Sequence, residues 1–228
     1  MKKTRLLGVV YACICVLFFP TIAKAATVLD FGIKAPTTGT LSYAGGAAPL
    51  VGSDIDVDDV VGLNTSLNNN VLSICASCTL DLQTGASTGG STGGWNYGAG
   101  GTITITGGID FPDATPDIAT GTTLLQGTFN SATVIDLGSG TFEFQILGGS
   151  FTDTKHPELL AFYGLPDIGY VGGLNISFST TANMGDFFTS DQIFSGNVTN
   201  QPVPLPAAAW LFASGLLGLI GIARKKAA

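Results

Sequence analysis

Positively charged residues are almost absent from the central part of this sequence. Of nine lysines and arginines in 228 residues, only Lys34 and Lys155 lie between positions 26 and 202. The same stretch holds all sixteen acidic residues, so two cations against sixteen acids leave a formal net charge of −14. Such a surface repels nucleic acid and anionic lipid and attracts cations. We therefore exclude nucleic-acid binding.

Histidine is nearly absent too, which limits the catalytic sites the chain can build. The one histidine, His156, precedes a proline at a predicted helix start, where a local structural role is favoured. No Gly-x-Ser-x-Gly segment occurs, which disfavours a serine hydrolase of the usual kind. Two carboxylates suffice for glycoside hydrolysis, and Asp136 and Glu143 lie on predicted strands. A carbohydrate-active enzyme is therefore only our third hypothesis, and we predict a protein that is not an enzyme.

The first 25 residues have the three parts of a secretory signal peptide. Lys2, Lys3 and Arg5 form a basic region, and an uncharged, mostly apolar stretch covers residues 6–19. Ala23-Lys24-Ala25 follows as a small-x-small cleavage site, so the exported chain is predicted to begin near residue 26.

The other end of the chain, residues 203–228, is organised as a short motif, an apolar run and a basic tail. The motif covers residues 203–207, the uncharged run residues 208–223, and the tail residues 224–228. The run is near the lower limit for a transmembrane helix, and the basic tail matches the cytoplasmic side. We predict a single C-terminal transmembrane helix that leaves residues 26–202 outside the inner membrane.

This C-terminal segment resembles the PEP-CTERM sorting signal, in its VPLPA-CTERM variant. The resemblance rests on Val203-Pro204-Leu205-Pro206-Ala207, the apolar run, and Arg224-Lys225-Lys226. It implies a Gram-negative bacterium, an exosortase-type membrane protease as partner, and export associated with exopolysaccharide and biofilm. It also implies a precursor anchored in the inner membrane that then reaches the cell surface or extracellular matrix. One departure is Leu205, which replaces the acidic residue of the parent motif.

The region between the two ends, residues 26–202, is predicted to form one β-rich domain. Apolar and polar residues alternate in Leu174–Ser179, Phe142–Ile146 and Thr102–Thr106, as in half-buried strands. This spacing predicts an antiparallel β-sandwich or jelly roll, with a β-solenoid as the alternative. One short helix is predicted at 156–164, with proline at its start and glycine after its end. The body is also similar to uncharacterised exported proteins with this signal, through segments 52–62 and 100–107.

Cys75 and Cys78 are the two cysteines outside the signal peptide. In an oxidising compartment, a pair this close in sequence most simply forms a disulfide with a small loop. A redox motif would need an electropositive setting, and a metal site would need two further ligands. Both alternatives remain open at this point.

The densest group of acidic residues is Asp54, Asp56, Asp58 and Asp59. Four carboxylates so close together repel one another, and a calcium ion would relieve that repulsion. The alternative is a strand with Ile55 and Val57 directed inward and the acids in water. The strand alternative is favoured, so no cofactor is predicted, and calcium is the one candidate that the sequence suggests.

Trp95 and Tyr97 interrupt a stretch of Gly, Ser and Thr at 84–101, which we predict to be a surface loop. Aromatic faces in such a loop could stack on sugar rings. The alternative is that they fold back and cover the core.

Together these features favour a non-enzymatic exported protein of the cell surface or extracellular matrix, associated with exopolysaccharide. The alternative is a polysaccharide-binding module or adhesin that stays anchored at the surface.

Overall fold

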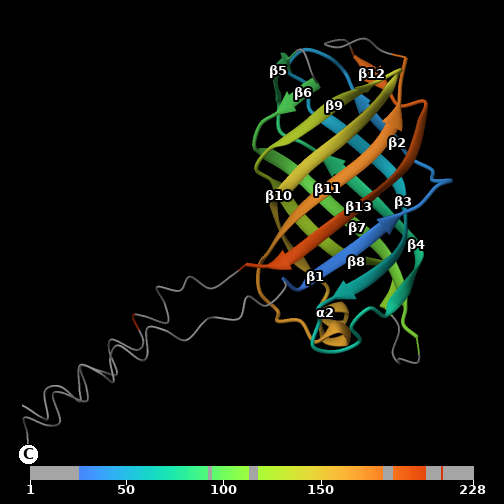
Figure 1. The fold of residues 1–228 in the computed structure, drawn as a ribbon, viewed down its shortest axis with the longest axis vertical. Helices are drawn as coiled ribbons and strands as arrows, with labels where there is room; N and C mark the ends of the chain where they lie inside the picture. Colours follow the sequence, from blue (N-terminus) through green and yellow to red (C-terminus); the bar gives the residue numbers. More distant parts are fainter. Residues whose placement is uncertain (1–25, 92–93, 113–117, 182–186, 204–211, 213–228) are drawn as a thin grey trace, which may run out of the picture.

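The computed structural model describes residues 26–91, 94–112, 118–181, 187–203 and 212. These residues form strands and one short helix (Figure 1). The strands are β1 (Val28–Ile33), β2 (Thr40–Tyr43), β3 (Leu50–Leu63), β4 (Leu72–Gln83), β5 (Ser87–Ser91), β6 (Gly94–Tyr97), β7 (Gly100–Asp110), β8 (Ile118–Phe129), β9 (Ala132–Gly138), β10 (Thr141–Lys155), β11 (Tyr170–Ser179), β12 (Phe188–Thr189) and β13 (Gln192–Pro202), and the helix is α2 (Pro157–Tyr163).

Eight of the strands close into an antiparallel barrel. Their order around the barrel is β1-β3-β4-β7-β8-β10-β11-β13, and β13 pairs again with β1. The long strand β10 completes the circle because its second half pairs with β8 on one side and with β11 on the other. Its first half also pairs with β11 but has β9 rather than β8 on the other side, and β9, β6 and β5 form an extension above the barrel.

The all-β, antiparallel prediction with one short helix is confirmed, but the predicted sandwich is wrong. A sandwich has two sheets with free edges, whereas here the pairings of β10 with β11 and of β13 with β1 remove the edges of the main sheet. The solenoid alternative is wrong as well, because every strand pairing among the described residues is antiparallel.

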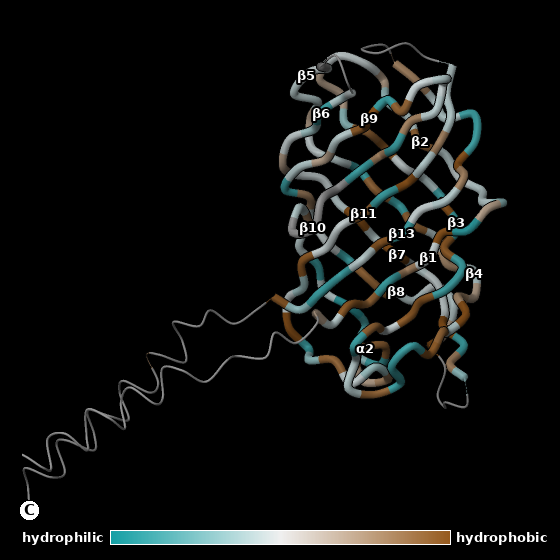
Figure 2. Tube along the Cα trace, viewed as in Figure 1, coloured by the Kyte–Doolittle hydropathy of each residue, from teal (hydrophilic) through white to brown (hydrophobic). Residues whose placement is uncertain are grey.

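The barrel interior is filled by apolar side chains from alternate strand positions. Figure 2 shows hydrophobic and hydrophilic residues alternating along the strands. On β1, for example, Leu29, Phe31 and Ile33 are buried, whereas the intervening residues face outward and are half-buried. Interiors of eight-stranded barrels are just wide enough for side chains to fill them. The described core therefore resembles an ordinary hydrophobic core rather than a channel.

An aromatic cluster packs where the strand extension meets the barrel. The Trp95 ring of β6 lies 5.4 Å from the Phe142 ring of β10 and 5.1 Å from the Phe188 ring of β12. Phe178 of β11 stacks on both phenylalanines, with centroid distances of 5.8 and 5.6 Å. The extension is thus held to the barrel by buried rings as well as by strand pairing.

The helix α2 lies at the opposite end of the barrel (Figure 1). Pro157 is at its start, and Gly164 ends it in the left-handed conformation with φ 64°, which confirms the predicted helix. Leu159, Leu160 and Tyr163 are buried. The Tyr163 hydroxyl lies 2.9 and 3.0 Å from two backbone carbonyl oxygens, those of Val60 and Val71. These contacts hold the helix against β3 and against the residue that precedes β4.

Candidate functional site

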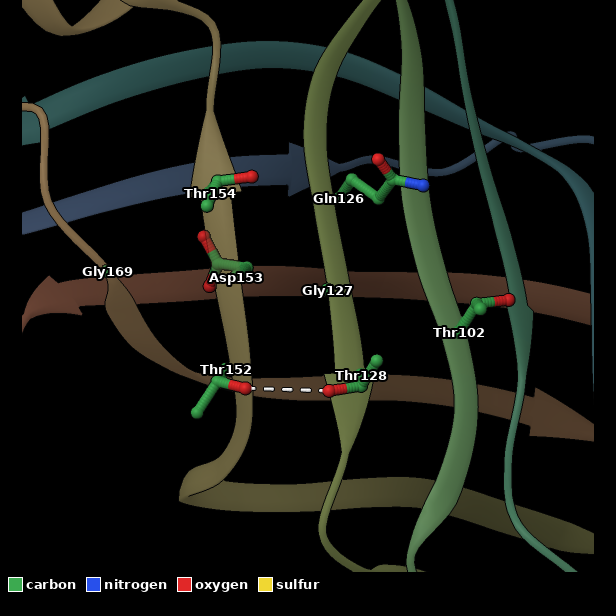
Figure 3. Close-up of a pocket in the computed structure, with 8 residues that line it drawn as sticks. All are labelled: Thr102, Gln126, Gly127, Thr128, Thr152, Asp153, Thr154 and Gly169. Carbon is green, nitrogen blue, oxygen red and sulfur yellow. Dashed lines mark hydrogen bonds between the residues drawn. The ribbon is translucent and has the colours of Figure 1, made fainter.

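A shallow hollow of about 440 Å³ lies on the outer face of β7, β8 and β10 (Figure 3). Its exposed side chains come from outward positions on these three strands: Thr102, Gln126, Thr128, Thr152 and Thr154. Strand pairing places Thr128 opposite Thr152 and Gln126 opposite Thr154. The Thr128 and Thr152 hydroxyl oxygens are 3.5 Å apart.

The chemistry of this threonine-lined hollow is hydrogen bonding without charge. Each hydroxyl donates and accepts, and the amide of Gln126 does both as well. Asp153 also borders the hollow, but its side chain is fully buried on the inner side of β10. Threonine suits strands because its branched side chain packs well on a pleated surface. The hollow thus presents neutral donors and acceptors from a rigid sheet.

The acidic segment that suggested calcium lies in β3. Ile55 and Val57 are buried, and Asp56 and Asp58 face outward, as the alternative reading of this segment predicted. Asp54 has a positive φ of 52° and lies at an irregularity in the pairing of β3 with β4. The run is therefore a bulged strand rather than a loop that could wrap around an ion.

The carboxylates of this segment also have separate partners. Asp56 accepts a hydrogen bond from the Thr38 hydroxyl at 2.7 Å, and Asp58 accepts one from the backbone N–H of Lys34 at 2.7 Å. Asp59 is buried and forms an ion pair with the Lys34 ammonium. Over the described residues, no group of three or more His, Cys, Asp or Glu side chains is placed to hold a metal ion. The structure therefore does not assemble the predicted calcium site.

Cys75 and Cys78 lie side by side on β4, as two thiols rather than the predicted disulfide. The strand is irregular between them, and Ser77 has a positive φ of 53°. The Cys78 thiol donates to the Gly108 carbonyl oxygen at 3.2 Å. A hydrogen bond with Cys78, together with burial, raises the pKa of the Cys75 thiol, which disfavours a nucleophilic thiolate. A disulfide between these two cysteines, which an oxidising compartment would favour, stays a prediction.

Trp95 and Tyr97 do not lie on a loop, and they do not face solvent. The glycine-rich stretch forms the strands β5 and β6, and β6 pairs with β9. Trp95 is 1% exposed and Tyr97 is 2% exposed. The predicted sugar contact by these rings is therefore wrong for this structure, because neither ring offers a face to a ligand. The alternative, that they cover the core, is the observed arrangement.

Most of the predicted targeting segments lie outside the described residues. This applies to the signal peptide at 1–25, to motif residues Pro204–Ala207 and to the basic tail at 224–228. Val203 follows directly after β13 and is 43% exposed. In the part of the chain that the structure describes, no helix has the length and hydrophobicity required to cross a membrane.

Sequence reasoning missed one group of polar residues, which lies inside the barrel. Asp153 and Lys155 of β10 form an ion pair, and both side chains are 0% exposed. A signal was available, because Phe151, Asp153 and Lys155 occupy alternate positions of one strand and must share a face. Asp153 borders the threonine-lined hollow, but the side chains of the pair lie on the inner side of the strand, away from the threonine hydroxyls.

No family model matches this chain, and comparison with curated proteins and with solved structures gives no match either.

Proposed function

We propose that this chain is a non-enzymatic, exported protein of the cell surface or extracellular matrix, associated with exopolysaccharide. The observation that carries the proposal is the order of motif, apolar run and basic tail at residues 203–228. The same signal points to an exosortase-type membrane protease as the processing partner. A packed barrel interior is consistent with a structural role, since a protein of this kind works through its outer surface.

The threonine-lined hollow supports a more specific role, contact with a neutral polysaccharide. Neutral sugars present hydroxyl groups that donate and accept hydrogen bonds, and the hollow offers matching groups from three adjacent strands. An anionic polymer is disfavoured because the body carries a formal charge of −14, from two cations and sixteen acids. We therefore assign the polysaccharide contact to this face rather than to Trp95 and Tyr97.

Intact mass spectrometry of the native protein, recovered separately from the envelope and from the matrix, tests the destination. We expect matrix protein that lacks residues 1–25 and the apolar run at 208–223. Protein found only in the membrane fraction, with residues 208–228 retained, would favour the alternative of a permanently anchored adhesin. Protein found only in the cytoplasm with both ends intact would reject both.

The double substitution Thr128→Val and Thr152→Val tests the role of the hollow. Valine keeps the shape and strand preference of threonine but removes two hydroxyls. At about 1 kcal/mol for each lost hydrogen bond, retention on purified neutral exopolysaccharide should fall about tenfold or more. The matched control is Thr189→Val, which alters an exposed threonine on β12, a strand that pairs with β2. Equal retention of both variants and the unaltered protein would remove the hollow from the binding surface.

A further inference from the structure

The barrel interior holds a lysine, a carboxylic acid and a carboxamide in one group. Lys155 and Asp153 come from the end of β10, and Asn200 comes from the end of β13. The side chains of Lys155 and Asp153 are 0% exposed, and Asn200 is 1% exposed. Buried charges and amides are expensive unless they are fully paired, so the group requires an explanation.

Lys155 and Asn200 both contact the carboxyl group of Asp153. The Lys155 Nζ donates to its Oδ1, and the Asn200 Nδ2 donates to its Oδ2 at 2.7 Å. The ring of Tyr170 lies 4.2 Å from the lysine Nζ and shields it from water. Gly172 leaves room for this arrangement, because a side chain there would collide with the Asn200 amide.

The Asn200 carbonyl oxygen is the unsatisfied atom of the group. Within the described part of the chain it is buried and has no hydrogen-bond partner. A buried carbonyl oxygen without a donor costs free energy, and it leaves an acceptor position open to a neighbouring acid. Asp153 is the acid of the group, and its carboxyl group already accepts a hydrogen bond from the Asn200 amide nitrogen.

Burial also favours the uncharged forms of the lysine and the acid. It lowers the pKa of Lys155 to about 8 and raises the pKa of Asp153 above its ordinary value. An uncharged lysine amine is a nucleophile, and an uncharged carboxylic acid is a proton donor. The two reactive forms are thus the ones that the apolar surroundings prefer.

We propose that Lys155 and Asn200 form an intramolecular isopeptide bond inside the barrel, with Asp153 transferring the protons. The amine nitrogen of Lys155 adds to the Asn200 side-chain carbonyl carbon while Asp153 protonates the carbonyl oxygen. Asp153 then takes a proton from the lysine nitrogen and passes it to Nδ2 as the carbon–Nδ2 bond breaks and ammonia leaves. The oxygen returns its proton to Asp153 as the carbonyl group re-forms, so the acid ends as it began. One amine and one carboxamide become one secondary amide and one ammonia, so no oxidant or cofactor is required.

The position of this bond gives it a mechanical consequence. In the barrel β11 lies between β10 and β13, so the bond would tie two strands together across their common neighbour. β13 is the last strand of the barrel and leads directly into residue 203. Any pull on the C-terminal segment would reach the barrel through β13, and the bond would stop that strand from peeling away. Formation of the bond does not depend on the proposed function of the protein.

The scarcity of lysine and arginine supplies a direct test. Between residues 25 and 223, trypsin can cut only after Lys34 and Lys155. Trypsin does not cut after an acylated lysine, so the denatured, reduced full chain should leave one fragment that spans residues 35–224 or ends at its processing site. Its mass should be about 17 Da below the sequence mass, because one ammonia is lost. Tandem mass spectrometry should find the branch between positions 155 and 200.

Three variants show which groups are required. Lys155→Arg keeps a trypsin site but lacks the reactive amine, and Asn200→Ala lacks the acceptor, so each should give two unmodified fragments after trypsin. Asn197→Ala is the matched control, because Asn197 lies on the same strand but contacts Asp30 on the outer face. It should still give one lighter fragment.

The tryptic digest of the unaltered protein tests the cross-link even if a variant fails to fold. Two fragments with unmodified masses would overturn the proposal. Two fragments with a loss of about 17 Da on the second would indicate a cyclised asparagine without a cross-link, and would overturn it as well. One fragment lighter by about 18 Da, branched at position 153, would mean that Asp153 is the acceptor and that Asn200 is not.

Discussion

Replacing Trp95 with alanine is expected to lower the free energy of unfolding by about 3–5 kcal/mol. The indole is 1% exposed and packs against Phe142 and Phe188, so its removal leaves a large cavity where the strand extension meets the barrel. For a domain of this size, such a loss corresponds to a fall in Tm of about 6–20 °C. Thermal and denaturant unfolding of the purified protein measure it.

Phe187→Ala is the matched control for this experiment. Phe187 is an aromatic residue beside Phe188 in the sequence, but it is 75% exposed, so its removal should change stability by less than about 0.5 kcal/mol. If Trp95→Ala instead unfolds at the temperature of the unaltered protein while losing retention on exopolysaccharide, the indole faces the ligand and its buried position is wrong.

Raising the pH from about 10 to about 12 is expected to remove about 2–3 kcal/mol of stability through Tyr163 alone. Burial raises the pKa of this phenol to about 12, against an ordinary value of 10.0. The folded protein therefore holds the proton that the unfolded chain releases. The stabilisation is complete below pH 10 and is lost as the pH rises through this interval. Denaturant unfolding at several alkaline pH values gives the slope.

Tyr163→Phe separates this effect from general alkaline unfolding. The variant loses the hydroxyl that contacts Val60 of β3 and Val71, so it should be less stable at neutral pH but should show a shallower fall above pH 10. Tyr43→Phe serves as the control, because the Tyr43 hydroxyl donates to the Gly46 carbonyl in a turn outside the helix contact. An equal slope for Tyr163→Phe and the unaltered protein would show that Tyr163 does not titrate in this range.

The parts of the fold that depend on local signals were predictable. Pro157 and Gly164 delimit α2 because one restricts the backbone at a helix start and the other tolerates the left-handed conformation at its end. The inward positions of Ile55 and Val57 follow from the period-two geometry of a strand. Neither conclusion needs knowledge of a distant residue.

The candidate sites were harder to predict because each depends on partners far away in the sequence. The composition around Trp95 indicated a loop, yet the segment forms β6, because β9 supplies its pairing partner and Phe188 covers its ring. The carboxylates of β3 suggested a shared cation, yet Thr38 and Lys34 supply separate partners. The threonine-lined hollow combines three strands, and no single segment reveals it.

The sequence by itself determined the charge, the β class, the short helix α2 and the alternation of inner and outer side chains, since these follow from residue type and short-range periodicity. Only the tertiary structure decided that the sheet closes. Closure requires residues 29–33 to pair with residues 196–200, and alternation is the same in a barrel and in a sandwich. The same closure brings Lys155 and Asn200 onto one carboxyl group, because strands distant in sequence share one interior.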